Sequence, residues 1–325
     1  MPGFTTHYIF GMKAYNDMPF TPLKHTIAKY RWLYQLGLQG PDMFFYNIPI
    51  LRHRDYRNVG SYMHEHKVNA FFECCLRRIG SIRSRQQQEE AISYLAGFIN
   101  HYIADSICHP YVYGRIGYPV DAPTSMHHGM HAHLENELDA ILLWKYKKKK
   151  PSEFNQTATI CLNGQEIQFI SHFLASCINE TYYPITYRNN FQVTPAMVHR
   201  SIWALRFGCR TLSDKNGKKK FGIAQVESIF VNHPVASAKM VTDSVTDYRS
   251  SCNLNHEAWG NPWDPTRVST ASFVDLFHET LDKCSRVYAL LNSAVTDNMP
   301  LDKQDLSPLL AELGNESYHS GLPDE

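Results

Sequence analysis

Histidine and carboxylate side chains recur at four-residue spacing in two segments of the chain. In the first segment, His101, Asp105 and His109 are each four residues apart. On a helix this spacing places them on one face, with neighbouring side chains about 6 Å apart. The residues between them are mostly apolar, and charged groups on a buried helix must be paired or bound to a metal. Taken one at a time, each residue is equally compatible with an ordinary ion pair on a solvated face.

The second segment repeats the pattern on what we expect to be another helix. His131 and Glu135 are four residues apart, and His127 precedes them on the same stripe. His133 and Glu137 form a similar pair on a rotated face, so only one pair can point directly at a shared site. Two helices that each present His-x-x-x-carboxylate can enclose a multinuclear metal site between them. The residues that could replace an assigned ligand are His127, His128 and His133.

Three isolated residues are further candidates for such a site. Asp42 follows the Gly40–Pro41 turn, His64 lies near the start of an expected helix, and His7 lies in an apolar N-terminal segment. Each of them alone is more often a hydrogen-bonded structural residue. The chain has 17 histidines in all, and neutral imidazole is the commonest protein ligand of transition metals.

In its order along the chain, this pattern resembles the bacterial zinc-dependent phospholipase C family. It is also similar to the related zinc-dependent single-strand-specific nucleases. The resemblance covers roughly residues 1–145 and is strongest around His101–His109 and His131–Glu135. It implies a mainly α-helical domain that holds three zinc ions and hydrolyses phosphodiesters.

Carried over by position, the resemblance implies three sets of ligands. The first zinc would be held by His64, His101 and Asp105, with Asp42 beside it. The second would be held by His109, His131 and Glu135, although His109 lies closer to His101 than in the secreted phospholipases. The third would be held by His7 and would share Asp105. In the family the third zinc also binds an N-terminal tryptophan, which this sequence lacks; removal of Met1 would instead make Pro2 the terminal residue.

A cluster of two to three zinc ions suits the hydrolysis of a phosphodiester. Two zinc ions can bind the non-bridging oxygens and lower the pKa of a water molecule to about 7. No proposed ligand is a cysteine, which favours a catalytic over a structural site. We predict that Asp42, at the edge of the cluster, acts as the general base or orients the water.

The substrate is predicted less directly than the reaction. We expect a phospholipid-type phosphodiester, with a nuclease-type reaction at the same site as the alternative. Aromatic residues at 44–46 and 256–263 could contact a choline head group or stack on a base. They could equally pack in the core, as most aromatic side chains do.

Two rival interpretations belong to other classes of protein. A hemerythrin-like di-iron bundle also presents His and His-x-x-x-Glu on helices but does not hydrolyse esters. The early Asp42 and His7 argue against it, because such a bundle takes its ligands from helix interiors. A non-catalytic protein that retained the fold and the metals is the second rival, which the full set of ligands disfavours.

Helical periodicity supplies the elements that must position these residues. It predicts helices over 22–38, 60–79, 86–108 and 126–146, with Pro110 closing the third, and therefore a multi-helix bundle. Residues 157–169 predict a small β-hairpin around Asn163–Gly164. Further helices are expected over 168–181, 195–213, 223–231 and 272–295, with a loop over 253–266. We expect one mainly α domain over 1–295, with the metal ligands in 1–145 and cover in 151–295, and an acidic, partly mobile tail over 296–325.

The composition of this 325-residue chain limits the kinds of partner that we expect it to bind. With 32 basic and 31 acidic residues, it has no global attraction to nucleic acid, and no stable nucleic-acid partner is expected. The lysine runs at 147–150 and 215–220 could still allow transient contact with a membrane surface, although such runs are more often a cationic helix end and a solvated loop. Scattered cysteines, without Cys-x-x-Cys, indicate reduced thiols. Since neither a signal peptide nor a membrane-spanning segment is evident, we expect a cytoplasmic protein.

Overall fold

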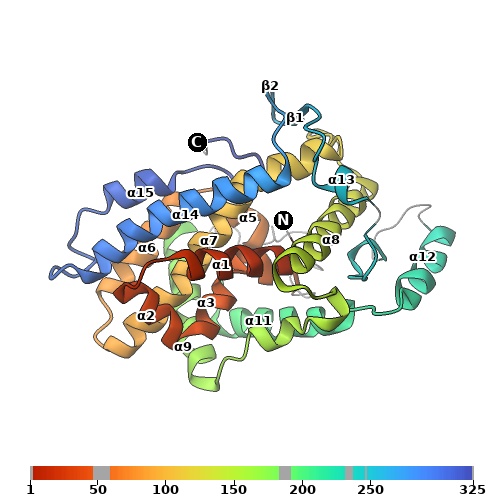
Figure 1. Cartoon of the computed structure of the whole chain (residues 1–325). Coiled ribbons are helices and arrows are strands. Elements are labelled where there is room, and N and C mark those ends of the chain that lie inside the picture. The colour runs from red at the N-terminus through yellow and green to blue at the C-terminus, as the bar shows by residue number, and fades with distance from the viewer. Residues whose placement is uncertain (1–2, 47–58, 183–191, 231–236, 246, 324–325) are drawn as a thin grey trace.

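The computed structural model describes residues 3–46, 59–182, 192–230, 237–245 and 247–323 (Figure 1). It confirms the mainly α fold. The central element is α7 (Arg85–Arg115), against which α1 (Phe4–Asp17), α3 (Arg31–Gly37) and α14 (Phe273–Thr296) pack. The middle of α7 is buried all round, as expected of a helix whose apolar residues do not keep to one face. The polar side chains in this part of α7 therefore point into the core, as its apolar side chains do.

Four predicted helices near the site have the expected positions but different ends. Segment 22–38 divides into α2 (Pro22–Lys29) and α3 at Tyr30, whose φ and ψ of −114° and 42° are not helical. Segment 60–79 divides into α5 (Val59–Glu65) and α6 (Val68–Gly80) at Lys67, which is left-handed. Helix α7 continues past Pro110 to Arg115. Helix α8 (Ser125–Lys147) closely matches the predicted range.

The predicted β-hairpin over 157–169 is wrong. Residues Gln156–Thr159 form the 3₁₀ helix η3, and Gly164 begins α9 (Gly164–Tyr182). The Asn163 side chain accepts hydrogen bonds from the backbone of Gln165 and Glu166, and the Glu166 carboxylate accepts one from the backbone of Asn163. Asn163 is therefore a helix cap and not a turn residue. The antiparallel hairpin instead begins in the predicted loop over 253–266 and extends beyond it, and it consists of β1 (Trp259–Asn261) and β2 (Asp264–Ser269).

The remaining elements complete the described part of the fold. They are the α-helices α11 (Pro195–Leu212), α12 (Lys218–Phe230), α13 (Tyr248–Ser251) and α15 (Ser307–Leu313), and the 3₁₀ helices η1 (Gly40–Tyr46), η2 (Pro151–Glu153) and η4 (Ser237–Lys239). Helices α11 and α12 agree with the predicted helical segments, except that residue 231 lies outside the described residues. Among the described residues, no helix has both the length and the apolar character needed to cross a bilayer.

The C-terminal segment is not a tail that extends from the domain. Helix α15 packs against α6 and α14, and Leu306, Leu309, Leu313 and Tyr318 are buried. The three leucines recur at three- and four-residue steps, but the acidic residues near them obscured the pattern. The expected extent of the domain, 1–295, stays a prediction, although residues 306–320 share its core.

Helices α3 and α7 cross so closely that neither accommodates a side chain at the contact. A Cβ at Gly97 would lie 2.1 Å from the backbone oxygen of Tyr34, and one at Gly37 would lie 2.1 Å from that of Tyr94. We expect Gly97→Ala to destabilise the protein by about 3 kcal/mol, because backbone cannot move aside as a flexible side chain can. Urea-induced unfolding measures this change. The control is Gly222→Ala in α12, where nothing lies within 4 Å of the new Cβ. For this control we expect the free energy of unfolding to rise by up to about 1 kcal/mol. Equal effects of the two substitutions would contradict the prediction.

Candidate metal centre

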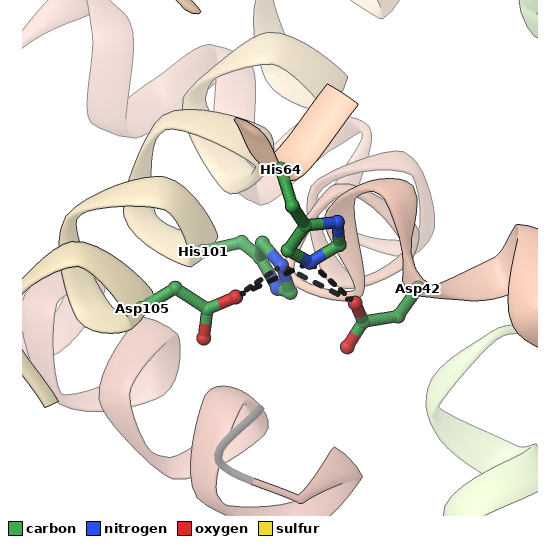
Figure 2. A group of neighbouring side chains, drawn as sticks. All are labelled: Asp42, His64, His101 and Asp105. Carbon is green, nitrogen blue, oxygen red and sulfur yellow. Dashed lines mark ion pairs between the residues drawn. The ribbon is translucent and has the colours of Figure 1, made fainter. Parts of the chain in front are cut away.

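Four buried side chains from three elements form the first group of possible metal ligands. Asp42 comes from η1, His64 from α5, and His101 and Asp105 from successive turns of α7. Figure 2 shows the two imidazoles between the two carboxylates. One ligand atom from each residue lies within 4.8 Å of the others, so the four atoms are near enough to one another to surround a single ion.

The contacts within this group pair each imidazole with both carboxylates. His64 Nε2 lies 3.2 Å from Asp42 Oδ1 and 3.6 Å from Asp105 Oδ2. His101 Nε2 lies 3.1 Å from Asp105 Oδ2 and 3.6 Å from Asp42 Oδ1. On the other side of Asp105, Oδ1 lies 3.1 Å from Nε2 of His7, which α1 supplies. The His7 ring also stacks on His101 at a centroid distance of 4.0 Å, so His7 contacts two members of the first group.

The second group, His109, His131 and Glu135, joins α7 to α8. His131 Nε2 lies 2.6 Å from Glu135 Oε1, and His109 Nε2 lies 3.8 Å from the same oxygen. His109 Nδ1 also lies 3.8 Å from Asp105 Oδ2. The two groups are therefore neighbours along one face of α7, as the four-residue spacing predicts. The structure brings together all eight predicted residues, while Pro2 lies outside the described residues.

Hydrogen bonds to backbone carbonyls fix three of the imidazole rings from behind. The Nδ1 atoms of His64, His101 and His109 lie 2.6, 3.1 and 2.7 Å from the carbonyl oxygens of Gly60, Leu38 and Tyr318. A carbonyl oxygen only accepts, so each Nδ1 must carry a proton. In the neutral ring, Nε2 is then an unprotonated acceptor, which is the arrangement found behind metal-bound histidines.

The Nε2 atoms and carboxylate oxygens that face the centre of the site are therefore hydrogen-bond acceptors that face one another. Among the described residues, Nε2 of His64, His101 and His109, Asp42 Oδ1 and both oxygens of Asp105 are buried without a hydrogen-bond partner. Unsatisfied polar atoms at this density are costly. Divalent cations would satisfy them together, and nitrogen and oxygen ligands without sulfur suit a catalytic zinc. The residues present therefore fit the metal that the sequence predicts.

Burial and neighbouring charges set the protonation of the cluster. Burial lowers the pKa of His109 to about 4 and also lowers that of His131. Burial raises the pKa of Asp105, but His109, His101 and His7 outweigh this and hold it well below its usual range. Burial lowers the pKa of His64, yet its contacts with Asp105 and Asp42 outweigh burial and raise it to about 9. Without metal, His64 is thus the site of a bound proton at pH 7.

This proton makes the stability of the metal-free protein depend on pH. Because the pKa of His64 rises from 6.5 to about 9 on folding, its stabilisation is complete below pH 6.5 and is lost as pH rises through about 9. We expect the free energy of unfolding to fall by about 3 kcal/mol over that range. Thermal unfolding of chelator-treated protein between pH 6.5 and 9 measures the loss. Zinc-loaded protein should not show this loss of stability, because the metal replaces the proton. His25→Asn serves as the control for an exposed histidine. A flat pH profile for the metal-free protein would refute the expectation.

A C-terminal segment that the sequence analysis missed completes the site. In residues 316–322, here the C-terminal strap, the Tyr318 carbonyl accepts the hydrogen bond from His109, and the Tyr318 amide donates to the His64 carbonyl at 2.9 Å. The His319 ring stacks on His64 at 5.1 Å, and its Nδ1 lies 3.1 Å from the hydroxyl of Tyr113. The only sequence signal was an aromatic residue and a histidine in an otherwise polar stretch.

Gly321 allows the strap to lie against α7. Its φ is +59°, and a Cβ there would lie 2.5 Å from the carbonyl oxygen of Ser106. Pro110 has no N–H to donate to that carbonyl oxygen inside the helix. The strap therefore lies against α7 where this backbone hydrogen bond is absent. We expect Gly321→Ala to lower zinc affinity about tenfold, the smaller of the effects seen when a partner behind a metal ligand is lost.

Equilibrium dialysis against zinc measures the affinity of the Gly321 variant. The matched control is Gly117→Ala, whose φ is +60° but whose Cβ would meet nothing within 4 Å. The control carries the same backbone strain without displacing the strap. If both variants bind zinc equally, the strap does not support the site.

Two other histidines of α8, His127 and His133, have partners outside the two groups. His127 Nδ1 interacts with the hydroxyl of Thr124 at 2.9 Å, at the start of the helix. His133 is 47% exposed and lies 3.6 Å from Glu137. The aromatic residues of the predicted pocket divide between two places: Phe44 is buried in the core, whereas Trp263 packs edge-on against Tyr113 at 4.9 Å, close to His131.

Comparisons with known proteins agree with the geometry. A family model described as zinc dependent phospholipase C matches residues 6–186, more than half of the chain. No curated protein and no solved structure matches the chain. The match includes all eight predicted ligands and ends well before the C-terminal strap.

Proposed function

The chain belongs to the zinc-dependent phospholipase C family, and from this premise we propose that it is a zinc-dependent phosphodiester hydrolase. The observation that carries the proposal is the pair of adjacent groups of nitrogen and carboxylate ligands, the first buried and the second partly buried. Two to three bound zinc ions would supply positive charge for the phosphodiester and a water molecule of lowered pKa.

The residues of the chain have distinct roles in this proposal. His64, His101 and Asp105 hold one zinc, and His109, His131 and Glu135 hold a second. His7 and Asp105 contribute to a third. Asp42 lies at the edge of the first group, where its carboxylate can accept a proton from the attacking water or orient it.

We propose a phospholipid as the substrate. The family description supports this assignment, and so does the aromatic pair beside the second group. Tyr118 and Trp263, both half-buried, stack at a centroid distance of 5.9 Å next to Tyr113. Aromatic surface beside a phosphate-binding site suits the apolar and cationic parts of a phospholipid.

Metal analysis combined with a substrate panel tests the proposal. Purified protein should contain two to three zinc ions per chain and release phosphocholine or a related phosphomonoester from phospholipids. It should lose this activity with a chelator and regain it with zinc. Two iron ions per chain with no zinc would instead indicate the di-iron bundle, and release of nucleotides alone would indicate a nuclease.

A further inference from the structure

Helix α11 exposes an aromatic pair on the side opposite to its packing face. Its buried residues, Val198, Ser201, Ile202, Leu205 and Cys209, face the protein. On the outer side, Trp203 and Phe207 are 63% and 53% exposed. Their rings are nearly parallel, with centroids 5.3 Å apart and 9° between their planes. Two adjacent large apolar rings exposed to water mark a surface that a partner covers.

Positive charge surrounds this aromatic pair. Arg200 and Arg210 are exposed on the same helix, Arg206 is half-buried, and α11 contains no acidic residue. Lysines follow at 215 and 218–220. The one acidic residue of this stretch, Asp214, is buried, and its carboxylate accepts a hydrogen bond from the backbone of Lys220. The segment 195–221 thus has seven basic residues against one acidic residue, in a chain whose net charge is only +1.

The same helix contacts an element of the metal centre. Helix α11 packs against η1, which carries Asp42. Gly208 lies against Tyr46, where a Cβ would come within 2.3 Å of the ring. In Figure 1, α11 runs along the lower edge of the molecule, and α12, with its exposed Phe221, projects beyond it at the right. A partner bound to the outer face of α11 would therefore lie one helix away from the element that supplies Asp42.

We propose that the basic aromatic face of α11, formed by Arg200, Trp203, Phe207 and Arg210, docks the protein on a bilayer that contains anionic phospholipid. Tryptophan and phenylalanine flanked by arginine and lysine are typical of helices that lie in the membrane interface. Anionic head groups attract each nearby basic residue. A bilayer fits better than nucleic acid, because the two rings stack on each other and leave less open aromatic face for bases. The inference rests on the proposed function, since a phospholipid hydrolase must reach a substrate held in a bilayer.

Vesicle binding by the full-length, zinc-loaded protein tests the docking face. Flotation should show binding at least about tenfold tighter to phosphatidylcholine vesicles with about 30% phosphatidylserine than to pure phosphatidylcholine vesicles. Arg200→Gln with Arg210→Gln should weaken binding to the anionic vesicles roughly 10- to 30-fold. Trp203→Ser with Phe207→Ser should weaken it about tenfold or more, and this loss should persist at high salt.

Each double variant has a matched control elsewhere on the surface. Arg83→Gln with Lys303→Gln removes the same charge from exposed positions, and Phe20→Ser removes a 99% exposed aromatic ring. These controls should bind as the unaltered protein does. Equal binding by the α11 variants and the controls would overturn the proposal. So would tighter binding of a single-stranded oligonucleotide that the α11 variants abolish, since this would identify the face as a nucleic-acid interface.

A soluble chromogenic phosphodiester separates this proposal from the proposed function. The α11 variants should hydrolyse it at the unaltered rate, because none of the four residues belongs to the metal centre. Loss of vesicle binding with unchanged soluble hydrolysis supports the docking face. If the protein binds anionic vesicles through α11 but hydrolyses no phosphodiester, the proposed function fails while the docking face stands.

Discussion

Replacing Asp105 with asparagine is expected to remove at least one zinc ion per chain and nearly all activity. Asp105 contacts four imidazoles, with His7 at 3.1 Å on one oxygen and His101, His64 and His109 at 3.1, 3.6 and 3.8 Å on the other. The amide keeps the shape but loses the charge, and its NH₂ group is a donor where an acceptor is required. We expect phosphodiester hydrolysis to fall by more than about 100-fold. Loss of a ligand should have a larger effect than loss of a residue that only hydrogen-bonds to a ligand.

Metal analysis and hydrolysis rates measured on the same sample test the Asp105 prediction. Asp17→Asn is the control, because Asp17 lies on the surface in an ion pair with Lys13. The control should keep its full zinc content and activity. An Asp105→Asn protein that retained both would show that the cluster does not work through this carboxylate.

The second large effect is expected at Asp42, where catalysis should be separable from metal binding. Asp42 Oδ1 lies 3.2 Å from His64 Nε2 and 3.6 Å from His101 Nε2. Asp42 comes from the 3₁₀ helix η1, at the edge of the group. If it serves as the general base, Asp42→Asn should lower kcat roughly 10²- to 10⁴-fold. Zinc content should stay close to that of the unaltered protein, because His64, His101 and Asp105 remain.

The pH profile distinguishes a base from a ligand at this position. In the Asp42→Asn protein, the acidic limb of kcat should disappear if Asp42 accepts the proton. Asp42→Glu should restore part of the rate, since it returns the carboxylate at a longer reach. Loss of zinc in parallel with activity would instead make Asp42 a fourth ligand of the first zinc, without a role in proton transfer.

The metal centre could be predicted from the sequence wherever its ligands lie on one helix. His101, Asp105 and His109 share a face of α7 because their spacing matches the helical period, and His131 and Glu135 do the same on α8. Local geometry fixes these relationships before any tertiary contact forms. His7, Asp42 and His64 come from separate elements, and their order along the chain became informative only through the family resemblance.

Other features were predicted wrongly or missed, one because two local signals compete and the others because their causes are not local. The Asn163–Gly164 pair is a strong turn signal, but Glu166 three residues later completes a helix cap that outweighs it. The real hairpin, at Trp259–Ser269, packs on α7, where the carbonyl of Gly260 lies against Gly114. The C-terminal strap depends on a hydrogen bond between residues 209 positions apart, and no periodic pattern encodes such a contact.

The C-terminal strap also determines when the metal centre can be finished during synthesis. The first predicted ligand, His7, is translated near the beginning of the chain, whereas the Tyr318 carbonyl that orients His109 is added more than 300 residues later. A ribosome-bound chain that ends before Tyr318 has its ligands but lacks this support behind His109. Tight zinc uptake is therefore expected only once Tyr318 has been added to the chain, and proteolytic clipping near residue 316 should return a folded protein to the state that lacks this support.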